Sequence, residues 1–180
     1  MSVRTLIERL SRHLVVKRRL PARFGRGPLF VSPAAALSYW HVDLGKVDRM
    51  LLDIAFEHVH TGDVVWDIGA NVGLFTFAAA NLSGATGRVL AVEPDIWLAN
   101  ILLRSAGMDE NHRLKVDVLP VAVTNAVDLR EFNIAMRGRA SNHLATSVPS
   151  PMAGGVRETR LVPTVTLDWL LARYPAPRFV

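Results

Sequence analysis

The stretch that most constrains the fold is residues 64–73, VVWDIGANVG. A short apolar run ends at Asp67, and two glycines follow, Gly69 and Gly73, with Asn71 between them. An apolar run of helical length comes next, and this order is typical of a buried strand, a tight turn and a helix. Glycine lets the backbone approach a ligand closely, and the helix start offers unpaired N–H groups. The stretch therefore predicts a nucleotide-like ligand at the carboxyl end of a parallel strand.

The spacing of the glycines argues against a dinucleotide. A dinucleotide loop requires G-x-G-x-x-G, and counting from Gly69 puts Asn71 and Leu74 where the second and third glycines should be. The pattern here is D-x-G-x-N-x-G, which resembles the first motif of class I S-adenosylmethionine-dependent methyltransferases. An acid at the loop suits a cationic ligand and would repel a pyrophosphate. Two roles for Asp67 remain open, which are to bind N–H groups of the turn and to orient the methionine end of the cofactor.

Two further acids are candidates for the same ligand. Glu93 lies 24 residues after Gly69, at the end of the next predicted strand. An acid in that place accepts hydrogen bonds from both ribose hydroxyls, and the alternative is a solvated turn residue before Pro94. Asp117 is either near the adenine edge or the polar member of an alternating strand. The predicted cofactor-binding residues are therefore Asp67, Gly69, Asn71, Gly73, Glu93 and Asp117.

The rest of the pattern predicts an α/β fold. We expect strands over residues 64–67, 88–93, 114–123, 129–134 and 161–166. We expect helices over residues 47–60, 96–106 and 167–173. A further helix should begin with Asn71 as its N-cap and end before Gly84. Alternating strands and helices give right-handed βαβ units and a parallel sheet. Pro120 indicates a bulge or an edge in the third strand. Residues 29–31 suit a short edge strand, and the aromatic-rich residues 38–41 are placed to pack over the glycine loop.

The positive charge is concentrated at the N-terminus. Residues 1–26 hold eight basic residues and one acid, whereas the remainder holds 13 basic and 15 acidic residues, a net charge of −2. A uniformly basic surface is therefore not expected, and we predict no nucleic-acid partner. Residues 3–16 show helical spacing with a basic face, which favours a helix packed on its own domain or on a second subunit over a membrane-surface helix. We expect residues 1–60 to form an N-terminal helical and irregular extension, with the main domain over 61–180.

Composition restricts the remaining possibilities. The 180 residues suffice for one core, half of them are hydrophobic, and there are no cysteines. No apolar run approaches the length of a membrane span and no signal-peptide pattern opens the chain, so we expect a cytoplasmic protein. No metal-ligand spacing stands out. The candidate bases are His143, His41 and Asp168, each favoured as structural, so the catalytic base stays unassigned.

Three segments together resemble the FkbM family of methyltransferases: VVWDIGANVGLFTFAAA, VLAVEPD and VPTVTLDWLL, over about residues 60–180. The resemblance implies a class I methyltransferase (Rossmann-like) fold, an S-adenosylmethionine cofactor and O-methylation of a sugar or natural-product hydroxyl. The acceptor would be a small molecule or a glycan, and a homo-oligomer is compatible with the pattern. The resemblance implies that the family's cofactor motifs correspond to Asp67, Gly69, Asn71, Gly73 and Glu93 of this chain.

The sequence departs from the family pattern at its end. In the family a strand with a K-I-D-V-E-G-type motif follows the last segment, whereas this chain ends at Val180. We therefore expect a sheet that is incomplete in its C-terminal half. The strand over residues 64–67 then either presents an open edge or is covered by something else. Two alternative functions remain, which are an NAD(P)-dependent oxidoreductase and an inactive binding or assembly module whose basic arm docks a partner.

Overall fold

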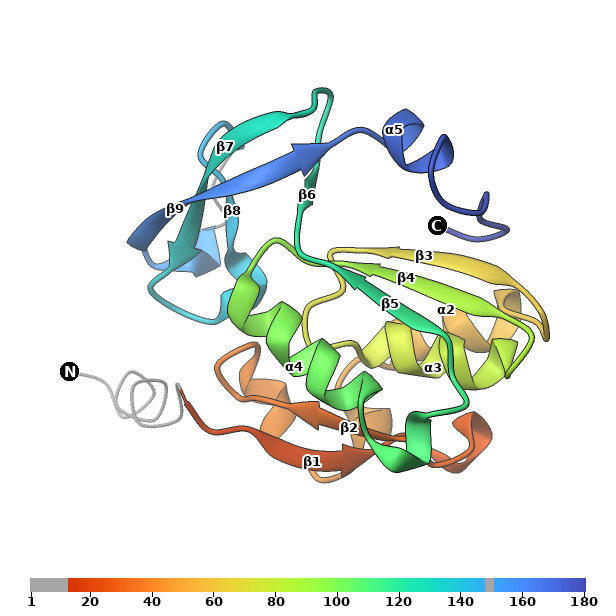
Figure 1. Ribbon diagram of the computed structural model, residues 1–180. Coiled ribbons are helices and arrows are strands. Elements are labelled where there is room, and N and C mark those ends of the chain that lie inside the picture. The colour runs from red at the N-terminus through yellow and green to blue at the C-terminus, as the bar shows by residue number, and fades with distance from the viewer. Residues whose placement is uncertain (1–12, 148–150) are drawn as a thin grey trace.

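The computed structural model describes residues 13–147 and 151–180 as a mixed α/β fold (Figure 1). Its strands are β1 Val16–Arg19, β2 Pro28–Val31, β3 Val64–Ile68, β4 Arg88–Val92, β5 Val116–Leu119, β6 Ala122–Val123, β7 Asp128–Ala135, β8 His143–Leu144 and β9 Val156–Val165. Its helices are α2 Arg49–His58, α3 Leu74–Ser83, α4 Ile96–Ala106 and α5 Leu167–Leu171. The helix expected over residues 3–16 falls mainly outside the described residues, and Val16 begins a strand instead.

Strands β3, β4 and β5 form a parallel sheet in that order. Helices α3 and α4 connect these strands, so the predicted strand–helix alternation is confirmed between residues 64 and 119. Side chains alternate between the two faces of the sheet, as the period of a strand requires. Val65, Val89 and Ala91 belong to the larger apolar core, and Trp66, Leu90 and Val92 belong to a smaller one on the opposite face.

Helices α2, α3 and α4 cover one face of this sheet, and the β1–β2 hairpin lies beyond them (Figure 1). Leu20, Phe24 and Leu29 from the hairpin region are buried in the same core as Val65. On the opposite face, Leu170 of α5 packs against Trp66, whose indole N–H donates to the Pro175 carbonyl at 3.2 Å. The described part of residues 1–60 therefore shares its core with the sheet.

A second sheet has the order β6-β9-β7-β8 and is mixed, because β6 runs parallel to β9 while the other pairs are antiparallel. The expectation of one parallel sheet is therefore too simple. The strand expected over residues 114–123 is divided at Pro120, and its two parts, β5 and β6, join different sheets. Proline has no N–H for a ladder bond, and the chain turns there with the Val121 N–H bonded to the Leu119 carbonyl at 3.0 Å.

The outer edge of β3 has a neighbour, so the edge is covered rather than open. Phe179 forms a parallel bridge to Val65, and its carbonyl accepts from the Trp66 N–H at 2.9 Å. The Arg178 N–H donates to the Val64 carbonyl at 2.8 Å. β3 thus has β4 on one side and residues 178–179 on the other. Ligands of α/β sheets bind at the carboxyl end of a strand in this position.

The start of α3 also differs from the prediction. The N-cap is Gly73 rather than Asn71, and the helix begins at Leu74. Asn71 has a φ of +53°, and its N–H bonds to the Glu93 carboxylate, so it belongs to the loop. A long-range contact thus overrides a local capping preference.

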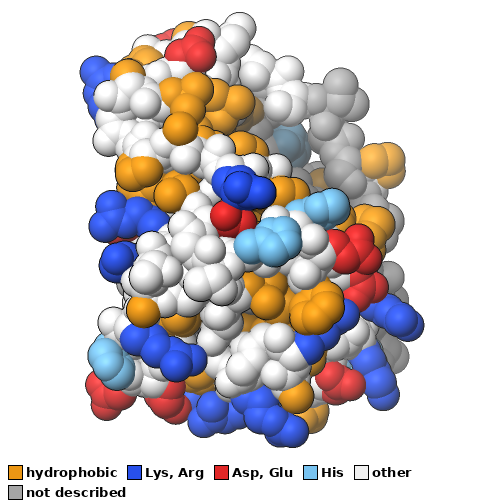
Figure 2. All heavy atoms as spheres, turned by 90° about the vertical axis from the view of Figure 1, so that its right-hand side faces the viewer, with side chains coloured by type: hydrophobic (Ala, Val, Ile, Leu, Met, Phe, Trp, Pro, Cys, Tyr) orange, Lys and Arg blue, Asp and Glu red, His pale blue; other side chains and the backbone are white. Residues whose placement is uncertain are grey.

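Charges of both signs mix on the face that Figure 2 shows, with basic residues frequent toward its lower edge. Several basic residues of the N-terminal region bind acids of the domain. Glu110 accepts from Lys17 at 2.9 Å and from Arg19 at 3.3 Å, and Asp53 accepts from Arg23 at 2.6 Å. Such exposed pairs stabilise a fold by about 0–1 kcal/mol each. None of the helices in the described ranges has the length and apolarity needed to cross a bilayer.

Candidate functional site

The glycine loop wraps around the carboxyl end of β4. The Gly69 and Ala70 N–H groups both donate to the Val92 carbonyl, at 2.9 and 3.0 Å. Gly69 and Gly73 have φ values of +88° and +92°, which favour glycine over any other residue. A Cβ atom on Gly69 would meet nothing within 4 Å, so this position faces open space. The loop therefore presents bare backbone to a ligand.

Glu93 follows β4 and holds this loop in place. Its side chain is buried, with 5% of the residue exposed. One carboxylate oxygen accepts from the Asn71 N–H and the other from the Asp95 N–H, both at 2.8 Å. Burial raises the pKa of Glu93 to about 7, against the lowering effect of the two N–H bonds. A carboxylate offers about four acceptor positions, so two remain for a ligand hydroxyl pair.

Asp67 lies in β3, one residue before the strand ends at Ile68. Its carboxylate accepts from the Thr76 hydroxyl of α3 at 2.5 Å. Burial raises the pKa of Asp67 to about 6, and the bonds from Thr76 oppose the rise. Two acids of raised pKa thus flank the turn, and perturbed carboxyls of this kind concentrate at functional sites.

Asn71 supplies the third polar group of the loop. Its side-chain Oδ1 is buried and has no hydrogen-bond partner within the described chain. An acceptor without a donor is unfavourable by about 1–3 kcal/mol when buried. A ligand that donates a hydrogen bond at this place would remove that penalty.

Two cavities meet at the loop. The larger has a volume of about 320 Å³ and is lined by residues of the N-terminal region and of β3–α3, including Ser38, Tyr39, Asp48, Leu51, Asp67 and Phe75. The smaller has a volume of about 140 Å³ and is lined by Glu93, Pro94, Leu98, Phe132, Arg139 and Asn142. Gly69, Asn71 and Ala140 line both. The two spaces together form a path across the carboxyl ends of β3 and β4.

Five of the predicted residues lie in this loop region, since Gly73 starts α3 and the other four line the cavities. Asp117 does not join them. It lies in β5, two residues before the strand ends, and its carboxylate accepts from the Tyr174 hydroxyl at 2.5 Å. Arg88 approaches the same carboxylate at 3.5 Å. The partners of Asp117 are therefore structural ones on the α5 side of the sheet.

Residues from elsewhere in the chain complete the lining of the cavities, and most of them carry no signal in the sequence. Ser38 and Tyr39 line the larger cavity, as their aromatic-rich segment suggested, but Asp48 was not singled out. Asp48 caps α2 by accepting from the Leu51 N–H at 3.0 Å. Burial raises the pKa of Tyr39, and the charges of Asp48 and Asp67 add to the rise, so its hydroxyl stays protonated.

The three candidate bases line neither cavity. His143 lies in β8, with its ring nitrogens near the Ser141 carbonyl at 3.1 Å and the Asn133 amide at 3.5 Å. His41 and Asp168 are exposed. A general base is therefore not assigned to any of them.

Comparison with known proteins bears on this arrangement. The family model described as the methyltransferase FkbM domain matches residues 67–180. No curated protein matches the chain. The solved structures similar to it include that of the M. jannaschii tRNA m1G37 methyltransferase, with 16% sequence identity and a TM-score of 0.41. That likeness covers 63% of this chain and 34% of the other, so the chain spans about a third of the length of that relative. Because the family model covers well over half of the sequence and includes the whole glycine loop, the chain belongs to the FkbM methyltransferase domain family.

Proposed function

We propose that this protein is an S-adenosylmethionine-dependent O-methyltransferase with a class I methyltransferase domain over residues 61–180. The observation that carries the proposal is the buried Glu93 carboxylate beside a glycine loop at which two cavities meet. The adenosine end of the cofactor would occupy the smaller cavity, with Glu93 accepting from the ribose hydroxyls. The methionine end would occupy the larger one, where Asp67 attracts the ammonium group.

The residues present fit this cofactor in three respects. Glu93 keeps two acceptor positions after binding the loop. The buried Asn71 Oδ1 is an acceptor without a donor. Gly69 leaves open space where any side chain would project. Two ionisable carboxyls beside the loop also disfavour a pyrophosphate, which argues against the dinucleotide alternative.

When bound, S-adenosylmethionine supplies an electrophilic methyl group on its sulfonium. The chain's own part is then to align an acceptor oxygen with that methyl group and to exclude water, which is the main contribution of positioning to such reactions. We propose a hydroxyl of a sugar or natural product as the acceptor, because the family resemblance implies that class.

Calorimetry tests the proposal against its alternatives. We expect S-adenosylhomocysteine to bind with one site per chain and NAD to give no heat of binding under the same conditions. Binding of NAD alone would favour an oxidoreductase. If neither ligand bound to folded protein, the assembly-module interpretation would replace the one proposed here.

The affinity for S-adenosylhomocysteine should depend on pH in one direction. Ribose hydroxyls and an ammonium group favour the ionised carboxylates, so both acids must lose their protons for binding. With pKa values of about 7 for Glu93 and about 6 for Asp67, the dissociation constant should fall about tenfold or more between pH 6 and pH 8. Above pH 8 the curve should be flat until the ligand's own ammonium group loses its proton, because both carboxyls are then ionised.

Titration calorimetry at several pH values measures this dependence. The Glu93→Gln variant is the matched control, since it keeps the side-chain shape and removes the ionisable group. In that variant only the step near pH 6 should remain, with weaker binding throughout. A wild-type affinity that fell as the pH rose would contradict the proposed roles of both acids.

A further inference from the structure

The segment over residues 138–142 crosses above the glycine loop. Ala140, at its centre, lines both cavities together with Gly69 and Asn71. On one side the segment is held by backbone bonds to the N-terminal region: the Arg139 N–H donates to the Ala34 carbonyl at 2.8 Å, and the Ala140 N–H donates to the next carbonyl at 3.0 Å. The segment therefore forms part of the roof of the proposed cofactor site.

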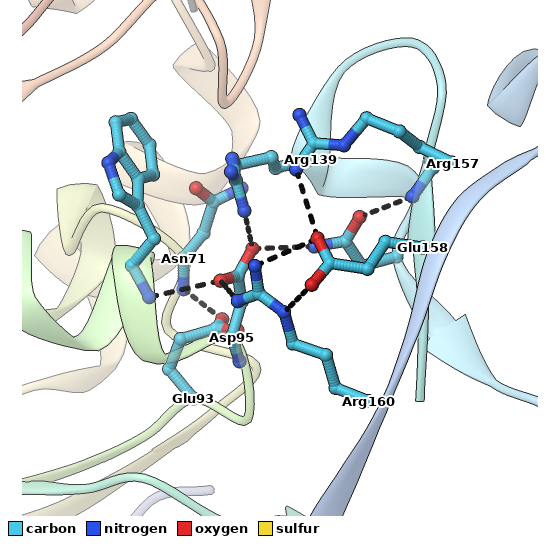
Figure 3. A network of polar contacts seen from close by, with 10 residues as sticks. Asn71, Glu93, Asp95, Arg139, Arg157, Glu158 and Arg160 are labelled. Atoms are coloured by element: carbon cyan, nitrogen blue, oxygen red, sulfur yellow. Dashed lines mark hydrogen bonds and ion pairs between the residues drawn. The ribbon is translucent and has the colours of Figure 1, made fainter. Parts of the chain in front are cut away.

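On the other side the roof is held by one buried acid, Asp95 (Figure 3). Its carboxylate is fully buried, and one oxygen accepts from the Arg139 guanidinium and from the Asn142 amide, the latter at 2.8 Å. The other oxygen caps α4 by accepting from the Trp97 N–H at 3.0 Å. The Arg139 guanidinium also lies over the Trp97 ring, 4.5 Å from its centroid. Asp95, which follows β4 of the parallel sheet, thus holds residues 138–142, which lie between β7 and β8 of the mixed sheet.

This contact lies next to the proposed ribose carboxylate. The Asp95 N–H donates to Glu93, so the two acids share one turn. The Arg139 side chain is only 10% exposed, and Arg160 lies 4.0 Å from the other Asp95 oxygen. A buried ion pair with satisfied hydrogen bonds fixes geometry strongly, since removing one partner leaves an uncompensated charge. Movement of the roof away from Asn71 therefore requires this contact to break.

We propose that the contact of Asp95 with Arg139 and Asn142 is a latch that keeps residues 138–142 over the bound nucleoside and sets how slowly it dissociates. This rests on the proposed function, because the nucleoside is that of the cofactor. In these terms Asp95 and Arg139 are positioning residues, which act through the roof and through Ala140. Asp95 lines neither cavity, whereas Arg139 belongs to the roof and also lines the smaller cavity.

Two variants open the latch in different ways. Asp95→Asn keeps an oxygen to cap α4, since asparagine is a good N-cap, but it replaces the acceptor of the Arg139 and Asn142 bonds. Arg139→Ala removes the cation and leaves Asn142 and Arg160 beside the carboxylate. In both we expect the dissociation rate constant of S-adenosylhomocysteine to rise about tenfold or more, with a smaller change in the association rate constant. Arg139→Lys keeps the positive charge but loses the planar set of guanidinium donors, so its dissociation rate constant should lie between those of wild type and Arg139→Ala.

Stopped-flow displacement measures these rates, and urea unfolding of the ligand-free variants shows separately that each is folded. Arg137→Ala is the matched control, because this exposed arginine lies two residues before Arg139, just outside the roof segment, and its removal should leave the rate unchanged. If wild-type protein binds the ligand and both latch variants release it within twofold of the wild-type rate, the latch proposal is wrong and the proposed function stands. If folded wild-type protein does not bind it, the proposed function fails and the latch fails with it.

Discussion

Replacing Glu93 by alanine is expected to weaken the binding of S-adenosylhomocysteine by at least about 30-fold, because truncating one partner of a buried, charged hydrogen-bond group removes roughly 2–5 kcal/mol. Two effects combine in this variant. The ribose hydroxyls lose their acceptor, and the Asn71 and Asp95 N–H groups lose theirs. Each orphaned N–H group lowers the free energy of unfolding by about 1–3 kcal/mol. Calorimetry and urea unfolding measure the two effects separately.

Two further variants serve as controls for the Glu93→Ala measurement. Glu57→Ala makes the same chemical change on the exposed surface of α2 and should leave the dissociation constant within twofold of wild type. Glu93→Gln keeps one oxygen for the loop and should bind with intermediate affinity. If Glu93→Ala folded and still bound the ligand as tightly as wild type, Glu93 would have no role at the ribose.

Replacing Gly73 by alanine is expected to destabilise the fold by about 3–5 kcal/mol. A Cβ atom there would lie 2.5 Å from Leu102 Cδ2 and 2.9 Å from the Phe77 ring. Overpacking of this kind is unfavourable by about 1–3 kcal/mol, and a φ of +92° adds about 1–3 kcal/mol of backbone strain for any L residue. The midpoint of urea unfolding should fall without a change in its slope, since the extent of the buried surface stays the same.

Gly69→Ala is the matched control for this prediction. Its φ of +88° imposes a similar strain, but a Cβ atom there meets nothing within 4 Å. We expect a loss of stability of about 1–2 kcal/mol from strain alone, together with weaker ligand binding, because the new methyl group projects into the path between the two cavities. Equal destabilisation by the two variants would contradict the steric argument at Gly73.

The strand–turn–helix order around residues 64–106 was predictable because each signal there is local. An apolar run, a glycine turn and an apolar helix follow one another, and Asp95 and Gly107 mark the ends of the next helix. Periodicity and turn chemistry decide such elements over a few residues. The positions of Gly69 and Glu93 at neighbouring strand ends follow from the same order.

Other features depended on contacts between distant residues. Asn71 looks like an N-cap in the sequence, but the carboxylate of Glu93, 22 residues later, takes its N–H group and makes it part of the loop. The strand around Pro120 divides because β9, more than 30 residues later, pairs with β6. Phe179 covers the outer edge of β3, for which the sequence left an open and a covered edge as alternatives. No local pattern encodes partners at these separations.

For this protein the sequence alone determined the family, the glycine loop and Glu93, the acid that follows β4. Each of these signals lies within a short segment, so the residue types and their spacing are enough to predict it. Only the tertiary structure decided what surrounds the loop: Tyr39 and Asp48 on one side, and Ala140 held by Asp95 and Arg139 above it. Cavity linings and side-chain contacts of this kind join residues that are distant in the sequence. They therefore depend on how the elements pack against one another, which no local pattern specifies.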